Sequence, residues 1–225
     1  MAGHKLEKGD VVDFVKSATW KTAAHTFGNF HNTIIGLLVH AWINPKKRPV
    51  DRKERWVLEG APALVNHKGH QCYSDGIFVS DTSPVGILEV EGLHPLGYES
   101  KGERHPGACD KMCDYLSANP GWFGLCVFYP VYPRGPKAKK ELRFIKDREN
   151  KRAKADILDK GKRVQNKKDG VLMIVFIEKE WQGETPDPNI GLRAQGAGYG
   201  RGIVTEIRGH LIAGKTHREE YRLWP

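Results

Sequence analysis

The segment from Asp75 to Glu91 constrains the fold more than any other part of the chain. Two apolar runs, 76–79 and 85–90, flank an Asp-Thr-Ser-Pro turn, and this pattern predicts a β-hairpin. Asp75 stands at the outer end of the first strand, while Glu89 and Glu91 stand near the end of the second. Because side chains alternate along a strand, the two glutamates point to one face. A hairpin brings its outer ends together, so we expect three carboxylates to converge on a patch that a divalent cation would neutralise.

The strand over 85–93 is otherwise apolar, and Glu89 and Glu91 are its only charged residues. A strand face that is simply exposed to solvent would carry a mixture of polar residue types. The pattern therefore favours a functional role for both glutamates over simple solvation.

The composition indicates an anionic partner. The chain of 225 residues suits one domain. Its 36 Lys and Arg exceed its 27 Asp and Glu by nine, a balance that favours nucleic acid. Residues 1–20 lack the apolar stretch of a signal peptide, and four cysteines are too few for a disulfide scaffold. The longest apolar runs, 34–39 and 171–177, are too short to cross a bilayer. We expect a cytoplasmic protein with no membrane partner.

Apolar periodicity and turn residues together predict an α/β order along the chain. The expected helices cover 10–20, 23–42, 51–59, 107–117 and 137–168, and the expected strands cover 63–67, 73–79, 85–93, 122–131, 171–177 and 202–208. The pattern predicts one mixed β-sheet flanked by helices in a single domain, with the strands at 122–131 and 171–177 central. Within it we distinguish an N-terminal helical segment (1–50), an α/β core (51–180) and a Gly-rich C-terminal extension (181–225) packed on the core.

An Asp at the end of one strand, a turn and then Glu-x-Glu on the next strand, within an α-β-β-β-α-β order, resembles the PD-(D/E)XK nuclease superfamily. The resemblance covers about residues 51–180 in element order, and Asp75, Glu89 and Glu91 carry the motif itself. Ser74 replaces the Pro that is frequent before the Asp, and Glu91 replaces the usual Lys. The resemblance implies a restriction-endonuclease-like fold and a metal-dependent nuclease, most simply a DNA endonuclease of restriction type.

The resemblance also implies a set of site residues. Asp75 and Glu89 would be metal ligands, and Glu59 would be a helical acid that reaches the metal through water. Glu91 would be a further ligand or the base that positions the attacking water, and Lys111 on the following helix is a candidate to replace the missing lysine. Mg²⁺, for which Mn²⁺ can substitute, would activate water and stabilise charge on the phosphate.

Basic residues around such a centre would hold the phosphodiester backbone. The resemblance gives double-stranded DNA as the expected partner and allows for a homodimer. The candidate nucleic-acid contacts are Lys46, Lys47, Arg48, Arg52, Lys53, Lys139 and Lys140.

Other patterns in the chain leave alternatives open. Asp169, Glu178 and Glu180 form a second acidic set, but no helix and strand follow it in the required order. The Gly-rich run 196–202 opens no helix and therefore does not match a phosphate-binding loop. A non-catalytic nucleic-acid-binding protein or a zinc-stabilised interaction protein are the alternative functions. The candidate zinc ligands, whose spacing departs from the usual structural patterns, are His67, His70, Cys72, His105, Cys109 and Cys113.

Overall fold

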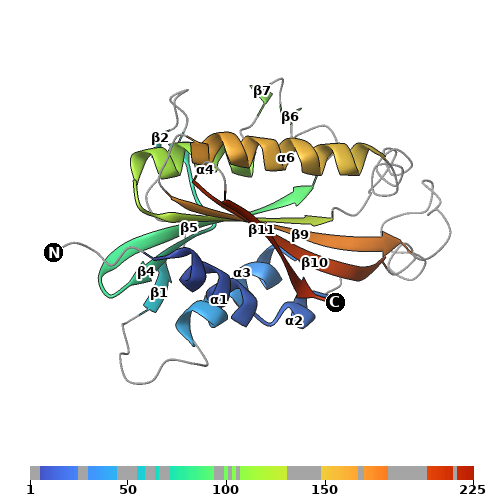
Figure 1. Ribbon diagram of the computed structural model, residues 1–225, viewed down its shortest axis with the longest axis horizontal. Helices are drawn as coiled ribbons and strands as arrows, with labels where there is room; N and C mark the ends of the chain where they lie inside the picture. Colours follow the sequence, from blue (N-terminus) through green and yellow to red (C-terminus); the bar gives the residue numbers. More distant parts are fainter. Residues whose placement is uncertain are drawn as a thin grey trace.

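A seven-stranded mixed sheet forms the centre of the computed structural model, with helices on both of its faces (Figure 1). The structure describes residues 6–24, 30–44, 55–58, 64–65, 71–93, 99–100, 103–104, 107–130, 148–166, 170–181, 202–214 and 217–225. The helices are α1 (Lys8–Ser17), α2 (Trp20–Ala24), α3 (Phe30–Ile43), α4 (Ala108–Ala118) and α6 (Arg148–Asn166). The strands of the main sheet are β1 (Arg55–Leu58), β4 (Gly76–Ser80), β5 (Ser83–Leu93), β8 (Phe123–Pro130), β9 (Val171–Trp181), β10 (Gly202–Ala213) and β11 (His217–Trp224).

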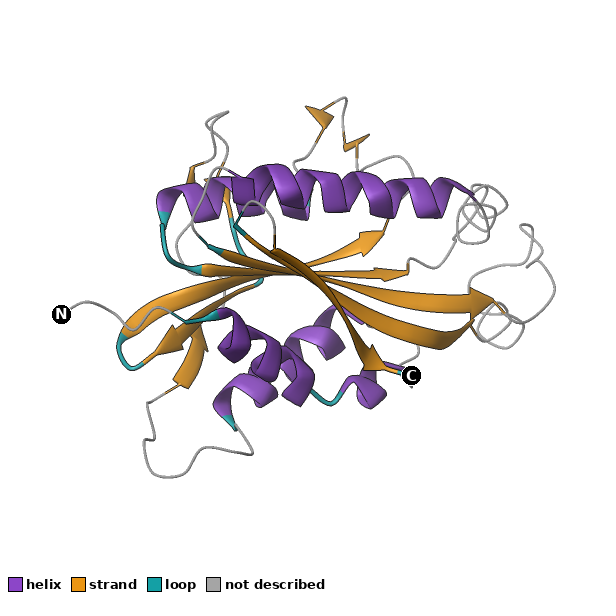
Figure 2. Ribbon diagram, in the orientation of Figure 1, coloured by secondary structure: helices purple, strands orange, loops and turns teal. Residues whose placement is uncertain are grey.

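The order of the strands across the sheet is β1-β4-β5-β8-β9-β10-β11. β5, β8 and β9 run parallel to one another, and the remaining neighbours are antiparallel. Parallel neighbours need a crossover connection. The crossover from β5 to β8 contains α4 and the one from β8 to β9 contains α6, and both helices lie on one face of the sheet (Figures 1 and 2).

Each face of the sheet has its own apolar core. On the face covered by α1, α2 and α3, the rings of Phe14, Trp42, Phe78 and Phe123 pack at centroid distances of 5.0 to 6.2 Å. On the other face, α4 packs Met112 and its neighbours against the sheet. β9 is buried from Val171 to Ile177, as its unbroken apolar run predicts for a strand covered on both sides.

The predicted hairpin is confirmed. β4 and β5 pair antiparallel from Ser80 opposite Ser83 to Gly76 opposite Leu88. Asp81 in the turn has a φ of 56°, a left-handed conformation that Asp tolerates better than most residues. The pairing continues beyond β4, because the backbone N–H of Asp75 donates to the carbonyl of Leu88 at 3.1 Å. The outer ends of the two strands therefore meet, as the sequence indicates.

The mixed α/β architecture and the central positions of β8 and β9 are also confirmed. Among the described helices, none is long and apolar enough to cross a membrane. Two short pairs lie apart from the main sheet: β2 (Leu64–Val65) with β3 (Gln71–Cys72), and β6 (Glu99–Ser100) with β7 (Glu103–Arg104).

One local expectation was wrong, and two were incomplete. The helix expected over 51–59 is replaced at 55–58 by β1, whose pairing with β4 half-buries Val57 and outweighs the capping pattern. The strand expected at 63–67 is β2, which pairs outside the main sheet. The C-terminal segment supplies two long strands, β10 and β11, instead of one short one, because pairing with β9 extends the sheet.

Candidate active site

The three predicted carboxylates lie together where the outer end of the hairpin meets the N-terminus of α4. Asp75 precedes β4 and crosses to β5, where its Oδ2 accepts a hydrogen bond of 2.6 Å from the backbone N–H of Val90. Val90 lies between Glu89 and Glu91, so Asp75 is held beside both glutamates. The negative charges of Asp75 and Glu91 both raise the pKa of Glu89.

Glu89 is the most unusual of the three acids because its side chain is only 1% exposed. Its Oε2 accepts from the ammonium of Lys111 at 2.7 Å, and its Oε1 is buried with no hydrogen-bond partner in the described part of the chain. Burial raises the pKa of Glu89 from 4.5 to about 8. Lys111 opposes this shift through its charge and hydrogen bond, while Asp75 and Glu91 add to it.

Lys111 comes from the first half of α4 and brings the positive charge that the strand motif lacks. Burial lowers the pKa of its ammonium, but the charge of Glu89 and the hydrogen bond to it, with Asp75 and Glu91, more than offset this effect. The net pKa of Lys111 lies above its ordinary value, so the ammonium stays protonated at neutral pH. One cation therefore stands within the electrostatic reach of all three acids.

Glu91 is fixed by the start of α4. Its Oε2 accepts a hydrogen bond from the backbone N–H of Ala108, one of the donors that a helix N-terminus leaves without an intrahelical partner. A negative charge is favourable there because of the helix dipole. Glu91 thus belongs to the cluster and also ties β5 to α4.

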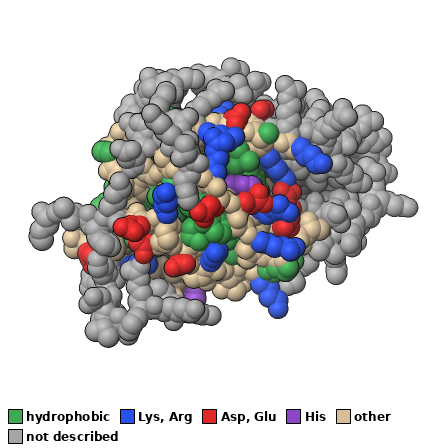
Figure 3. Space-filling view, viewed as in Figure 1, with side chains coloured by type: hydrophobic (Ala, Val, Ile, Leu, Met, Phe, Trp, Pro, Cys, Tyr) green, Lys and Arg blue, Asp and Glu red, His purple; other side chains and the backbone are tan. Residues whose placement is uncertain are grey.

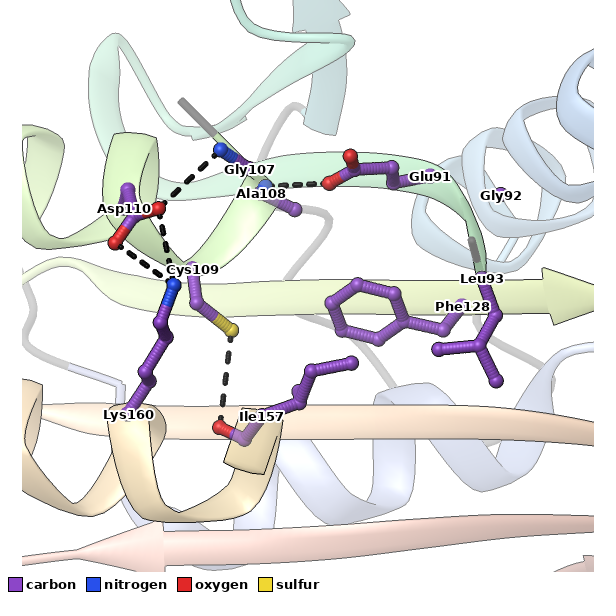
Figure 4. Close-up of a pocket in the computed structure, with 10 residues that line it drawn as sticks. All are labelled: Glu91, Gly92, Leu93, Gly107, Ala108, Cys109, Asp110, Phe128, Ile157 and Lys160. Carbon is purple, nitrogen blue, oxygen red and sulfur yellow. Dashed lines mark hydrogen bonds and ion pairs between the residues drawn. The ribbon is translucent and has the colours of Figure 1, made fainter. Parts of the chain in front are cut away.

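A small pocket adjoins the cluster at Glu91, as Figure 4 shows. It lies between the end of β5, the N-terminus of α4 and α6, with a volume of about 100 Å³. Phe128, Leu93 and Ile157 supply apolar walls, and an ion pair of 3.2 Å between Lys160 and Asp110 links α6 to α4 at its rim. The pocket gives the acidic cluster an accessible neighbouring space.

Two further residues stand near Asp75 on the side of α3, and neither was predicted. His31 in the first turn of α3 places Nε2 3.3 Å from Asp75 Oδ1. The rings of His31 and Tyr129 meet edge to face, with centroids 6.5 Å apart. Burial, together with the charges of Asp75 and Glu91, raises the pKa of Tyr129. The signal available in the sequence was a polar His-Asn pair at the start of an otherwise apolar helix.

The remaining candidate residues lie outside the described part of the chain or make other contacts. Glu59 and the seven predicted basic contacts lie outside the described residues, as do Asp169, His67, His70 and His105. Glu178 of the second acidic set pairs instead with Lys154 on α6. Cys109 is buried and packs with the apolar core beneath α4. On the face seen in Figure 3, acidic and basic side chains are interspersed.

The carboxylates of the cluster suit a hydrated divalent cation better than a closed protein cage. In the described part of the chain, no group of three or more His, Cys, Asp or Glu side chains is arranged to hold a metal ion. Mg²⁺ does not need such a cage, because it keeps several waters and binds through one or two carboxylates plus phosphate oxygens. Glu89 Oε1, buried and unpartnered in that part of the chain, and the neighbouring Asp75 carboxylate fit this requirement.

No protein-family model matches the chain, and comparisons with curated proteins and with solved structures found no match either.

Proposed function

We propose that the protein is a Mg²⁺-dependent nuclease of the PD-(D/E)XK type that hydrolyses phosphodiester bonds, most simply in double-stranded DNA. The observation that carries the proposal is Glu89, a buried carboxyl group with one oxygen on Lys111 and the other without a partner in the described chain. Burying an ionisable group without full compensation costs free energy, and such groups concentrate at functional sites. Asp75 and Glu91 at its side make a purely structural role more costly still.

The order of the elements supports the proposal. Apart from the two short strand pairs outside the main sheet, a helix (α3), three antiparallel neighbours (β1, β4, β5), a helix (α4) and a parallel strand (β8) follow one another. The types of element match the α-β-β-β-α-β order of the resemblance, with α3 and β1 in place of the helix and first strand expected over 51–59 and 63–67. Asp75 directly precedes the second strand of that series, and Glu89 and Glu91 lie on the third, which agrees with the resemblance.

Lys111 accounts for the departure from the motif. The family places Lys two residues after the Glu on the strand, and this chain has Glu91 there. The ammonium of Lys111 reaches Glu89 from α4 instead, and it is 28% exposed as a side chain. We assign to it the stabilisation of negative charge on the substrate phosphate, which protein cations near a reacting phosphate generally provide.

Each residue of the cluster has its own role in the proposed reaction. Asp75 and Glu89 would hold Mg²⁺, which when bound supplies a nucleophilic water at neutral pH and neutralises phosphate charge. Val90 N–H fixes the Asp75 carboxylate, and Ala108 N–H fixes Glu91. The formal charge of +9 on the whole chain favours approach of a polyanion.

Cleavage assays test the proposal. Supercoiled plasmid, single-stranded DNA and RNA are incubated with Mg²⁺ or Mn²⁺, with EDTA as the control. We expect metal-dependent cleavage that falls by about 100-fold or more in Asp75→Asn, Glu89→Gln and Lys111→Met. Asp159→Asn, which removes an exposed carboxylate paired with Lys162 on α6, should cleave normally.

The outcomes separate the alternatives. Salt-sensitive binding without cleavage under any metal would assign the chain to non-catalytic nucleic-acid binding. Loss of cleavage in Glu178→Gln but not in Glu89→Gln would move the site to the second acidic set. Stoichiometric zinc by elemental analysis, with no cleavage, would favour the zinc-stabilised interaction protein.

A further inference from the structure

The two oxygens of Asp75 have partners on different elements. Oδ2 accepts from the backbone N–H of Val90 on β5 at 2.6 Å. Oδ1 lies 3.3 Å from Nε2 of His31 on α3. A carboxylate only accepts hydrogen bonds, so this second contact requires a proton on Nε2. The backbone donor belongs to a paired strand and is rigid, whereas His31 is a side chain that a substitution can remove.

The ring of His31 is itself fixed on two other sides. The side-chain amide of Asn32 lies 3.2 Å from Nδ1, which accepts from the amide N–H when Nε2 carries the proton, and Tyr129 meets the ring edge to face. The side chain of His31 nevertheless remains 37% exposed and that of Asp75 24% exposed. A partly exposed ion pair of this kind contributes little to the free energy of unfolding, typically up to about 1 kcal/mol. Its geometry is thus better suited to orienting Asp75 than to stabilising the fold.

We propose that His31 is a positioning residue, which orients the Asp75 carboxylate for a divalent cation. This inference rests on the nuclease function proposed above. An ionised carboxylate offers about four acceptor sites, and Val90 and His31 use two of them, which leaves two for a cation. Donors of this kind behind a metal-binding side chain typically change metal affinity or activity by about 10- to 100-fold.

Mn²⁺ titration of the full chain tests the assignment without relying on cleavage. Free aqueous Mn²⁺ gives a strong electron paramagnetic resonance signal that falls as the ion binds. We expect His31→Ala to weaken Mn²⁺ binding by about 10- to 100-fold. His31→Gln retains an N–H donor and should recover part of the affinity, whereas Asn32→Ala should cause a smaller loss in the same direction. His40→Ala, an exposed histidine on the same helix, is the matched control and should bind Mn²⁺ as the wild type does.

Thermal unfolding in EDTA separates positioning from a structural role. Positioning predicts an unchanged Tm in His31→Gln together with weaker binding than wild type and stronger binding than His31→Ala. The assignment is overturned if His31→Ala and His40→Ala bind Mn²⁺ equally, or if His31→Gln binds no better than His31→Ala. In those cases the nuclease proposal stands. A wild-type protein that binds no Mn²⁺ would end both proposals, whereas His31-dependent binding without cleavage would end only the nuclease.

Discussion

Lys111 and Glu89 form an ion pair of 2.7 Å across 22 positions of sequence, and this contact joins α4 to the hairpin. It also sets the charge of the site, because Lys111 is the cation that opposes the effect of burial on Glu89. The effect of substituting one of these residues should therefore depend on the other. This applies to the free energy of unfolding, to its pH dependence and to metal affinity.

The first prediction concerns the pH dependence of stability in EDTA. The pKa of Glu89 is about 8 in the folded protein against 4.5 as the reference value, so the folded state binds the extra proton. The contribution of Glu89 is fully present below pH 4.5 and is lost as the pH rises through 8. At 1.4 kcal/mol per pKa unit, the loss amounts to at most about 5 kcal/mol. Glu89→Gln should lack this loss and should unfold at higher urea concentration than wild type at pH 8.

Urea unfolding from pH 5 to 9 measures this effect. The difference in urea midpoint between Glu89→Gln and wild type should become smaller toward pH 5. Asp159→Asn, in which an exposed carboxylate on α6 is replaced, should follow the wild-type profile. The opposite outcome is a wild-type free energy of unfolding that rises between pH 5 and 8, with the same pH profile in Glu89→Gln. This result would mean that Glu89 is not buried as a neutral acid.

The second prediction is a double-mutant cycle on Lys111 and Glu89. Lys111→Met removes the hydrogen bond to Glu89 and the cation that favours its ionised form, and should lower the free energy of unfolding at pH 8 by about 1 to 2 kcal/mol. The same change should cost much less in the Glu89→Gln background, because no charge then needs a partner. Equal costs in both backgrounds, measured by urea unfolding, would show that the pair is not energetically coupled.

The sequence pattern predicted the central strands of the sheet, but it did not predict the edge strands. The hairpin, β8 and β9 were predicted because turn residues and long apolar runs mark buried strands. β1 was mistaken for a helix, and β11 was missed because its first four residues, 217–220, include no apolar side chain. Both are edge strands, whose half-exposed residues are specified by the neighbouring strand more than by their own pattern.

The third prediction compares two glycines with opposite surroundings. A Cβ on Gly86 would lie 2.2 Å from the Phe123 ring, which is stacked on Phe78 and cannot move aside easily. Gly86→Ala should lower the free energy of unfolding by about 1 to 3 kcal/mol. Gly36 on α3 has nothing within 4 Å of such a Cβ, so Gly36→Ala should stabilise the protein by up to about 1 kcal/mol. Urea unfolding of both variants checks the pair, and an unchanged Gly86→Ala would argue against the stacking of these rings.

The fourth prediction concerns nucleic-acid binding in EDTA. The logarithm of the association constant should fall linearly with the logarithm of salt concentration, with a slope of about −0.9 per phosphate neutralised on duplex DNA. Fluorescence anisotropy of a labelled duplex measures it. A duplex of the same sequence with an uncharged backbone should not bind. A flat salt dependence would exclude the phosphate backbone as the main contact.

At the site, the sequence predicted the acids but not their partners. Asp75, Glu89 and Glu91 lie within one hairpin, where register and alternation place them. Lys111 and His31 come from two helices on opposite faces of the sheet, and their distances to the acids depend on how those helices pack. No spacing along the chain encodes that packing. Lys111 could be named as a candidate only because the motif lacked a lysine.

The separate origin of the acids and of their cation has a consequence for the folding pathway. A hairpin that forms before α4 docks carries three neighbouring negative charges with no cation among them, which opposes its closure. Docking of α4 brings Lys111 against Glu89 and gives Glu91 the N–H of Ala108. We expect the hairpin and α4 to become stable in one cooperative step, so that their amide hydrogens exchange with solvent as a single unit.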